Sequence, residues 1–366
     1  MRKDEVPSWE HNVRRLRDSD TTLTELRLAY TSIGEDRWRE IGAALAATST
    51  LTSMILWSCG ITAAGAAHLA EGVGKSACLA TLNLGNNQIG VSGAQALSTV
   101  LAATSTLTSL DLGDCGITAA GAAHLAEGVG KSAPLATLNL GSNQIGDSGA
   151  QALGAALAAT STLTSLNLGD CGITSAGAAH LAEGVGKSAS LATLILYYND
   201  LGDSGAQALR AALAATSTLT SLNLGYCGIT AAGAAHLAEG VGKSASLATL
   251  NLHGNKIGDS GAQALGAALA ATSTLTSLDL GSCGITAAGA AHLAEGVGKS
   301  ASLATLKLHG NTIGDSVAQA LGAALAATST LTSLNLWYCG ITAAGAAHLA
   351  EGVGKSASLA SGLDSW

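Results

Sequence analysis

The sequence is poor in charged, proline and aromatic residues. Charged residues fill 11% of its 366 positions, there are two prolines and no phenylalanine, and the aromatics are five Trp and five Tyr. A disordered chain would be polar, charged and rich in proline, whereas 48% of these residues are hydrophobic, enough for a sizeable core. The net charge of −8 offers no basic face for phosphates, so we expect no nucleic-acid partner.

Long apolar runs are also missing. Gly, Thr, Ser, His or Glu interrupts every stretch before it reaches the roughly 18 residues of a membrane span. The first ten residues have no apolar core of the kind that a signal peptide requires. We therefore expect a soluble, cytoplasmic protein with no membrane partner.

Internal repetition is what the sequence has in abundance. A leucine that opens the pattern L-x-x-L-x-L recurs every 28 residues, twelve times from Leu23 to Leu331. Two types of unit alternate, one with Cys at its ninth position, as at Cys115, and one with Asn there, as at Asn143. Both match L-x-x-L-x-L-x-x-N/C-x-L, the signature of leucine-rich repeats.

The repeat predicts its own fold. Leucines at positions 4 and 6 alternate as in a strand, and apolar residues at positions 15, 19 and 23 form one stripe of a helix. Strand, helix and strand in succession predict a parallel sheet with right-handed crossovers. Because helices are wider than strands, we expect a curved α/β solenoid, a horseshoe with the parallel sheet on its concave face and helices on its convex face.

The alternation of Cys-type and Asn-type units resembles the ribonuclease-inhibitor-like subfamily of leucine-rich repeats, which includes the sensor ends of NOD-like receptors and the Ran GTPase-activating protein. This resemblance implies a protein-binding module without catalytic activity. We divide the chain into an N-terminal cap (1–22), twelve repeats (23–358) and a truncated repeat (359–366). In the cap, Trp9, Val13 and Leu16 are expected to cover the open edge of the first repeat.

Position 9 carries the turn after each strand. An asparagine there can satisfy buried backbone groups through its side-chain amide. The cysteines of the other units lie two repeats apart, about 10 Å, too far for a disulfide. We expect all seven cysteines, including Cys78 outside this series, to be free thiols in a reducing compartment.

Six histidines recur at position 18, on the predicted helices. Two-repeat spacing prevents any pair of them from sharing an ion, so no metal-binding residues are expected. They are His68, His124, His180, His236, His292 and His348.

The segment Gly-Val-Gly-Lys-Ser, at residues 72–76 and in every second repeat after it, resembles part of a phosphate-binding loop. Leu69 stands where such a loop needs its first glycine, and the segment is expected to end a helix, with Lys75 near the helix C-terminus. No other group resembles a catalytic site. We therefore expect neither enzymatic activity nor a cofactor.

Differences among the repeats concentrate at positions 5, 7 and 8, on or just after the strand. Seven of the ten aromatic residues occupy positions 7 and 8. Because Trp and Tyr are enriched at binding hot spots, we predict that a protein ligand binds the concave face. The predicted contact residues are Tyr30, Trp57, Tyr197, Tyr198, Tyr226, His253, His309, Trp337 and Tyr338.

Three other interpretations remain open. The chain could be a regulator like the GTPase activators, although it has no acidic tail. It could be a self-assembling protein that associates through its C-terminal edge or its Ala-rich convex helices. The near-perfect repetition would also fit a consensus-designed scaffold. One irregularity, Val317 in place of a glycine at position 15, predicts local overpacking.

Overall fold

A computed structural model describes residues 9–356 of the chain. These residues divide into two compact units, the first ending at Gly172 and the second beginning at Ile173. Residues 1–8 of the predicted cap and the whole predicted truncated repeat, 359–366, lie outside the described residues. The boundaries predicted for the cap and for the repeat array therefore stay predictions.

The first unit alternates helices and short strands. Its elements are α1 (Trp9–Arg17), β1 (Glu25–Arg27), α2 (Glu35–Leu45), β2 (Ser53–Ile55), α3 (Ala63–Lys75), β3 (Thr81–Asn83), α4 (Gly90–Leu101), β4 (Ser109–Asp111), α5 (Ala119–Lys131), β5 (Thr137–Asn139), α6 (Gly146–Ala159) and β6 (Ser165–Asn167). Each strand pairs in parallel with the next along the chain, 28 residues on, as in Leu110 opposite Leu138.

The second unit continues the same order. Its elements are α7 (Ser175–Lys187), β7 (Thr193–Ile195), α8 (Gly202–Ala215), β8 (Ser221–Asn223), α9 (Ala231–Lys243), β9 (Thr249–Asn251), α10 (Gly258–Ala271), β10 (Ser277–Asp279), α11 (Ala287–Lys299), β11 (Thr305–Lys307), the 3₁₀ turn η1 (Asp315–Val317), α12 (Ala318–Ala327), β12 (Ser333–Asn335) and α13 (Ala343–Lys355). Its strands also pair in parallel with their chain neighbours.

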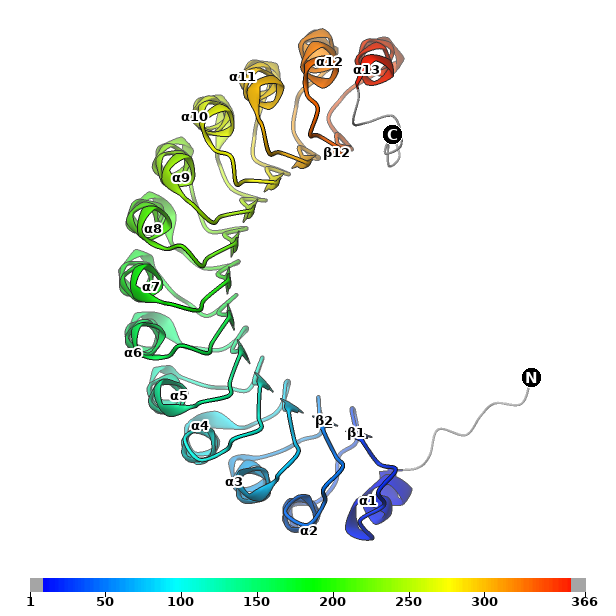
Figure 1. Ribbon diagram of the computed structural model, residues 1–366, viewed down its shortest axis with the longest axis vertical. Helices are drawn as coiled ribbons and strands as arrows, with labels where there is room; N and C mark the ends of the chain where they lie inside the picture. The colour runs from blue at the N-terminus through cyan, green and yellow to red at the C-terminus, as the bar shows by residue number, and fades with distance from the viewer. Residues whose placement is uncertain (1–8, 357–366) are drawn as a thin grey trace, which may run out of the picture. The chain divides into compact units, whose positions relative to one another are not determined.

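Within each unit the strands line the inner side of a curve and the helices its outer side (Figure 1). The core lies between these two layers. In the repeat that begins at Leu107, for example, Leu110, Leu112, Ile117 and Leu125 are all buried. The predicted α/β leucine-rich-repeat solenoid is thus confirmed. None of the described helices has the length and apolar character needed to cross a membrane.

Position 9 has the structural role expected from the sequence. The side-chain oxygen of Asn143 accepts hydrogen bonds from the backbone N–H groups of Cys115 and Ile117 in the preceding repeat, at 3.0 and 2.9 Å. Its amide nitrogen donates to the carbonyl oxygens of Leu112 and Leu140, at 2.9 and 2.8 Å. The amide nitrogen also donates to the Gly141 carbonyl at 3.2 Å, so one buried side chain satisfies five backbone groups that water cannot reach.

None of the seven cysteines, all of which lie in the part of the chain that the structure describes, forms a disulfide, as expected. The Cys115 Sγ donates to the Leu84 carbonyl of the preceding repeat at 3.2 Å. Burial raises the pKa of four of them to about 12. These are Cys115, Cys171, Cys227 and Cys283.

Val317 changes the start of its helix. In a regular repeat, a Cβ added to the glycine at position 15, such as Gly261, would stand 2.6 Å from Ile257 Cγ2. Where Val317 replaces this glycine, the chain forms the 3₁₀ turn η1, and α12 has 10 residues against the 14 of α10. The predicted overpacking therefore costs the helix its first turn.

At the N-terminus, α1 lies against α2. Leu16 is buried, Trp9 and Val13 are half-buried, and Arg14 and Arg17 are exposed. Trp38 on α2 is also fully buried.

Candidate binding surface

The residue at position 8 has a left-handed backbone in every repeat. Its φ is 62° at Tyr30, 54° at Tyr198 and Tyr226, and 52° at Tyr338, and it is also positive where the residue is Ser, Asn, Asp or Gly. This conformation suits Gly, Asn and Asp and is strained for a bulky residue. Four tyrosines at such a position are unexpected on conformational grounds alone, and strain of this kind gathers at functional sites.

In the first unit, Tyr30 and Trp57 form an edge-to-face pair. Their ring centroids are 4.7 Å apart, with the planes at 74°. A Cβ at Gly85, in the next repeat, would come within 2.8 Å of Trp57 Cδ1, so the glycine leaves room for the indole. Tyr30 is 75% exposed and offers its ring to a partner.

In the second unit, five rings form a continuous row, which we call the ring row. Successive centroids lie 5.7, 4.4, 5.1 and 5.1 Å apart, and the Tyr198 and Tyr226 planes are almost parallel, at 2°. The row brings together residues from the ends of strands β7, β8, β9 and β11. Its members are Tyr197, Tyr198, Tyr226, His253 and His309.

Trp337 and Tyr338 form a separate pair just after β12. Their centroids are 4.6 Å apart, and the side chains are 58% and 76% exposed. All nine predicted contact residues thus follow strands, and each touches another ring of the set. Their role in binding stays a prediction.

Position 5 contributes to the fold as well as to the surface. The Asn139 Oδ1 accepts the backbone N–H of Gly141, at 3.0 Å, and Asp111 Oδ1 accepts that of Gly113, at 2.9 Å. The Asn139 amide also donates to Asp111 on the neighbouring strand, at 2.9 Å. Part of the Asn and Asp content of position 5 is therefore explained by turn formation and not by recognition.

One grouping on this surface was missed by the sequence interpretation. His253, Asp279 and His309 each place a ligand-capable atom within 4.8 Å of the other two. The sequence signal that could have revealed it is a histidine at position 7 in two repeats that flank one with Asp279 at position 5 and Gly281 at position 7. This signal is weak, because side chains that are two repeats apart were expected to lie about 10 Å from each other and not to come into contact.

Two polar contacts lie on the ring row or beside it. The Tyr226 hydroxyl lies 2.9 Å from His253 Nε2, and the Lys307 ammonium lies 3.4 Å from Asp279 Oδ2. Partial burial, together with the neighbouring Tyr198, raises the pKa of the Tyr226 hydroxyl. The tyrosine therefore stays neutral and is able to donate a hydrogen bond.

The Gly-Val-Gly-Lys-Ser segments, which we do not expect to bind phosphate, lie on the helix side of the repeats. The Gly-Val-Gly-Lys-Ser segments end helices, as at α5, whose last residue is Lys131. Lysines of these segments pair with the glutamate one turn earlier, at 2.7 Å for Glu183 with Lys187 and for Glu239 with Lys243. The helical context expected for this motif is confirmed.

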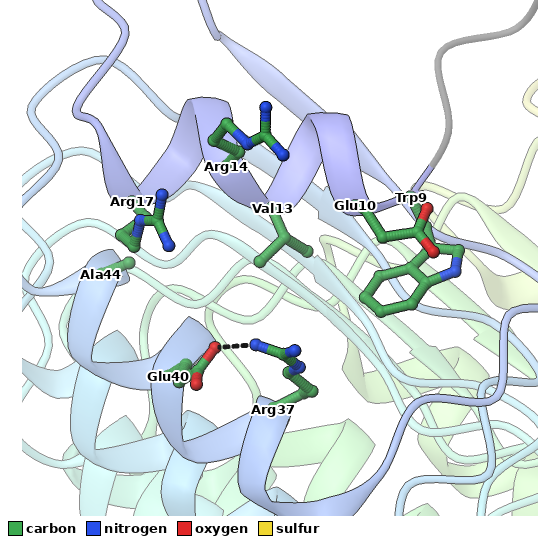
Figure 2. A pocket seen from close by; sticks show the side chains of 8 residues that line it. All are labelled: Trp9, Glu10, Val13, Arg14, Arg17, Arg37, Glu40 and Ala44. Carbon is green, nitrogen blue, oxygen red and sulfur yellow. Dashed lines mark hydrogen bonds and ion pairs between the residues drawn. The ribbon is translucent and has the colours of Figure 1, made fainter.

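A hollow of about 210 Å³ lies between α1 and α2, away from the strands (Figure 2). It is lined by Trp9, Val13 and Ala44, by three arginines and by two glutamates, and Arg37 pairs with Glu40 on the α2 side at 2.7 Å. Because both signs of charge line it, the hollow has no strong preference for an anion or a cation.

Parallel strands, outer helices and a 28-residue period define an α/β repeat solenoid. The family described as Leucine Rich repeat matches nine segments, which together span more than half of the chain. They are residues 75–98, 104–126, 131–154, 160–182, 187–209, 216–238, 243–266, 272–294 and 328–350. The protein belongs to the leucine-rich-repeat family.

Comparison with solved structures finds, among others, two that are similar to parts or most of the chain. An internalin (inlF) from Listeria monocytogenes is similar, with 20% identity and a TM-score of 0.51 over 95% of this chain and 88% of that one. The tropomodulin C-terminal domain from Caenorhabditis elegans has 17% identity and a TM-score of 0.37, over 41% of this chain and 92% of that one. No curated protein sequence matches the chain.

Proposed function

We propose that this protein is a non-enzymatic binding module that holds a protein ligand on the strand side of its repeats. The observation that supports the proposal best is the set of exposed tyrosines at position 8. Tyr30, Tyr198, Tyr226 and Tyr338 all have a left-handed backbone. Drift among copied repeats would favour residues that tolerate this conformation, so a contribution to binding is the better reason for tyrosine there.

The chemistry of these residues suits a protein surface. Tyr and Trp add a large contact area at a small cost in rotamer entropy, and their polar atoms can still hydrogen-bond. The ring row presents stacked faces and edges over several strands of the second unit. We infer that the ligand inserts apolar or aromatic side chains between these rings.

We further propose that the repeats are of the ribonuclease-inhibitor-like type and that the protein works in the cytoplasm. The alternation of Cys-type and Asn-type units supports the first point. Seven free thiols support the second, because an oxidising compartment favours disulfides.

The test starts with a partner recovered by affinity capture, identified by mass spectrometry and then purified. Its affinity is compared between the native chain and a variant with Tyr198→Ser, Tyr226→Ser and Tyr338→Ser. Serine occupies position 8 at Ser58, Ser142 and Ser282, so the variant keeps a residue that the turn accepts. Loss of a hot spot should weaken binding by at least about 30-fold, which is about 2 kcal/mol.

The matched control changes three residues on the helix side, His124→Ala, Glu127→Ala and Lys131→Ala. It should bind as the native chain does. If the control loses affinity while the tyrosine variant keeps it, the ligand binds the helices. Concentration-dependent assembly that the control abolishes would then favour self-association through the Ala-rich convex face.

A further inference from the structure

Three potential metal ligands meet at the end of three consecutive strands in the second unit. His253 follows β9, Asp279 is the last residue of β10, and His309 follows β11. One nitrogen or oxygen of each lies within 4.8 Å of the corresponding atoms of the other two. All three side chains are half-buried on the strand side.

A glycine allows the two imidazoles to approach each other. Their residues are two strands apart, about 10 Å along the sheet, yet the ring centroids are 5.1 Å apart. Both rings lean over Gly281, in the repeat between them. A Cβ on this glycine would stand 2.6 Å from His253 Nδ1 and 2.5 Å from His309 Nε2.

The imidazole nitrogens have unused hydrogen-bonding capacity. The Nδ1 atoms of His253 and His309 are buried and lack a hydrogen-bond partner. Among the side-chain atoms of the described residues, Ser132 Oγ is the one other buried atom without a partner. Buried polar atoms are normally paired, so each exception calls for a reason.

The surroundings of His253 resemble the outer shell of a metal site. Its Nε2 lies 2.9 Å from the Tyr226 hydroxyl, which leaves Nδ1 as the free nitrogen. Histidine ligands usually use their second nitrogen in such a hydrogen bond, which fixes both the tautomer and the ring orientation. Tyr226 is thereby a positioning residue for His253.

We propose that His253, Asp279 and His309 bind a divalent transition-metal ion of the zinc type. Two imidazoles and one carboxylate are donors that suit Zn²⁺, and three protein ligands leave a fourth position for water. Tetrahedral bonds of about 2.0–2.1 Å put the ligand atoms roughly 3.4 Å apart. Side-chain rotation that brings the ligand atoms closer by up to about 1.4 Å is enough to reach this spacing.

Lys307 competes with the ion for the carboxylate. Its ammonium lies 3.4 Å from Asp279 Oδ2, while Oδ1 accepts the backbone N–H of Gly281 at 3.0 Å. Oδ2 is therefore the oxygen available to a metal, and Lys307 has to turn away for the metal to bind. Lys307→Gln is expected to tighten binding several-fold.

The experiment titrates the full chain, freed of metal with a chelator, with Zn²⁺ and with Co²⁺ as a spectroscopic probe. We expect one equivalent to bind with a Kd of micromolar order. Loss of an outer-shell partner already costs about 10–100-fold in affinity, so removing a ligand should cost more than about tenfold. His253→Gly and His309→Gly are the ligand variants, because glycine is the residue at position 7 in neighbouring repeats such as those of Gly225 and Gly281.

Two further variants separate the site from other histidines and from unfolding. Gly281→Ala keeps all three ligands but places a methyl group between the imidazoles, so it should also weaken binding at least about tenfold. His292→Ala removes a helix histidine of the same repeat as Asp279 and should leave affinity unchanged. Circular dichroism checks that each variant is folded.

The proposal is overturned if the native chain shows no saturable binding, if both His→Gly variants bind like the native chain, or if His292→Ala loses as much affinity as they do. It does not depend on the proposed ligand-binding function. Trp337→Gly and Tyr338→Ser, outside the ring row, should leave metal binding intact whether or not they impair binding of a protein.

Discussion

At the scale of single residues, the turn after each strand imposes two demands. Position 8 needs a left-handed backbone, and position 9 needs a side chain that hydrogen-bonds to buried backbone groups, as Asn143 and Cys115 do. Asparagine at position 9 follows from the second demand. Tyrosine at position 8 is poorly suited to a left-handed backbone, and for this reason we propose that it is there for binding.

The first prediction concerns position 9. Asn143→Ala removes five hydrogen bonds to buried backbone groups, each worth about 1 kcal/mol. The free energy of unfolding should fall by about 5 kcal/mol in a urea titration. Gln144→Ala is the control, since this neighbouring side chain is exposed, and it should change stability by less than about 0.5 kcal/mol. Equal effects of the two substitutions would contradict the role given to Asn143.

The second prediction concerns the thiols. A pKa of about 12 keeps Cys115, Cys171, Cys227 and Cys283 protonated, and they are buried, so iodoacetamide should not modify them in the folded protein near pH 8. Half-buried Cys78 should react first. After unfolding without reductant, mass spectrometry should find seven alkylated cysteines. Any disulfide among them would overturn the assignment.

Sequence reasoning worked at position 9 and failed at the three-residue group around Gly281. The asparagine is recognisable because its hydrogen bonds follow from the repeat period. The approach of His253 and His309 depends on side chains that lean along the sheet over a glycine. The spacing of about 4.8 Å between strands gives the distance between backbones and not the direction in which a side chain points.

At the scale of elements, three aspartates each connect a helix to the repeat before it. Asp203 follows the start of α8, and its Oδ1 accepts the backbone N–H groups of Thr230 and Gly233, at 2.8 and 2.9 Å, at the start of α9. Asp259 and Asp315 do the same for α11 and α13. These carboxylates cap helices that begin in the next repeat.

The third prediction is the response of these caps to pH. Burial raises the pKa of Asp203 and Asp259, but hydrogen bonds from Thr230 and Thr286 outweigh it, and the net shift is downward. The hydrogen bond from Thr342 lowers the pKa of Asp315. A lowered folded-state pKa stabilises the fold at pH values above the unfolded pKa of about 3.9, and this stabilisation is lost as pH falls below it.

The variant with Asp203→Asn, Asp259→Asn and Asp315→Asn keeps an acceptor oxygen at each cap but cannot titrate there. Its free energy of unfolding, measured between about pH 7 and pH 3, should fall less steeply than that of the native chain. Parallel curves for the two proteins would contradict the prediction.

The fourth prediction concerns α12. Val317→Gly removes the side chain that prevents the first helical turn, so α12 should lengthen toward the 14 residues of α10. Relief of overpacking should raise the free energy of unfolding by about 1–3 kcal/mol, with a small gain in helical circular dichroism. Gly261→Val, at the same position of a regular repeat, should have the opposite effect. A loss of stability in Val317→Gly would show that the valine contributes more through burial than it costs in strain.

The order of strands and helices could be predicted because leucine spacing at positions 1, 4 and 6 determines which residues are buried. For α12, the sequence predicted overpacking at Val317 but not the loss of the first helical turn. Its 3₁₀ turn depends on how closely the glycine of position 15 approaches the isoleucine before it and the preceding helix, a distance that the sequence does not contain.

At the scale of the whole molecule, the contacts within each unit run from one repeat to the next. Asn143, for instance, bonds only to its own repeat and to the preceding one, through Leu112, Cys115 and Ile117. Stability in such an array is approximately a sum of repeats and of interfaces between neighbours. The two repeat types, however, are not interchangeable. The turn glycine with positive φ stands at position 10 in Cys-type repeats, as Gly116, and at position 12 in Asn-type repeats, as Gly146.

This difference predicts that the structural module is a pair of repeats. Deleting residues 107–162 removes one Cys-type and one Asn-type repeat and places Leu163, which opens a Cys-type repeat, after the Asn-type repeat as before. The shortened chain should unfold cooperatively, and the amplitude of its circular dichroism should fall in proportion to the residues removed. Deleting residues 107–134 alone brings two Asn-type repeats together. The Asn143 Oδ1 then meets the turn of Asn87 in place of the N–H groups of Cys115 and Ile117. The backbone N–H groups of Gly90 and Gln144 lose their acceptors, the carbonyls of Cys115 and Ile117.

Each buried backbone group left unsatisfied costs about 1–3 kcal/mol. The chain that lacks one repeat should therefore be less stable than the chain that lacks two, although it retains 28 more residues. Urea denaturation of the two deletion variants measures this directly. A simple decrease of stability with the number of repeats removed would mean that the alternation of Cys and Asn has no energetic role.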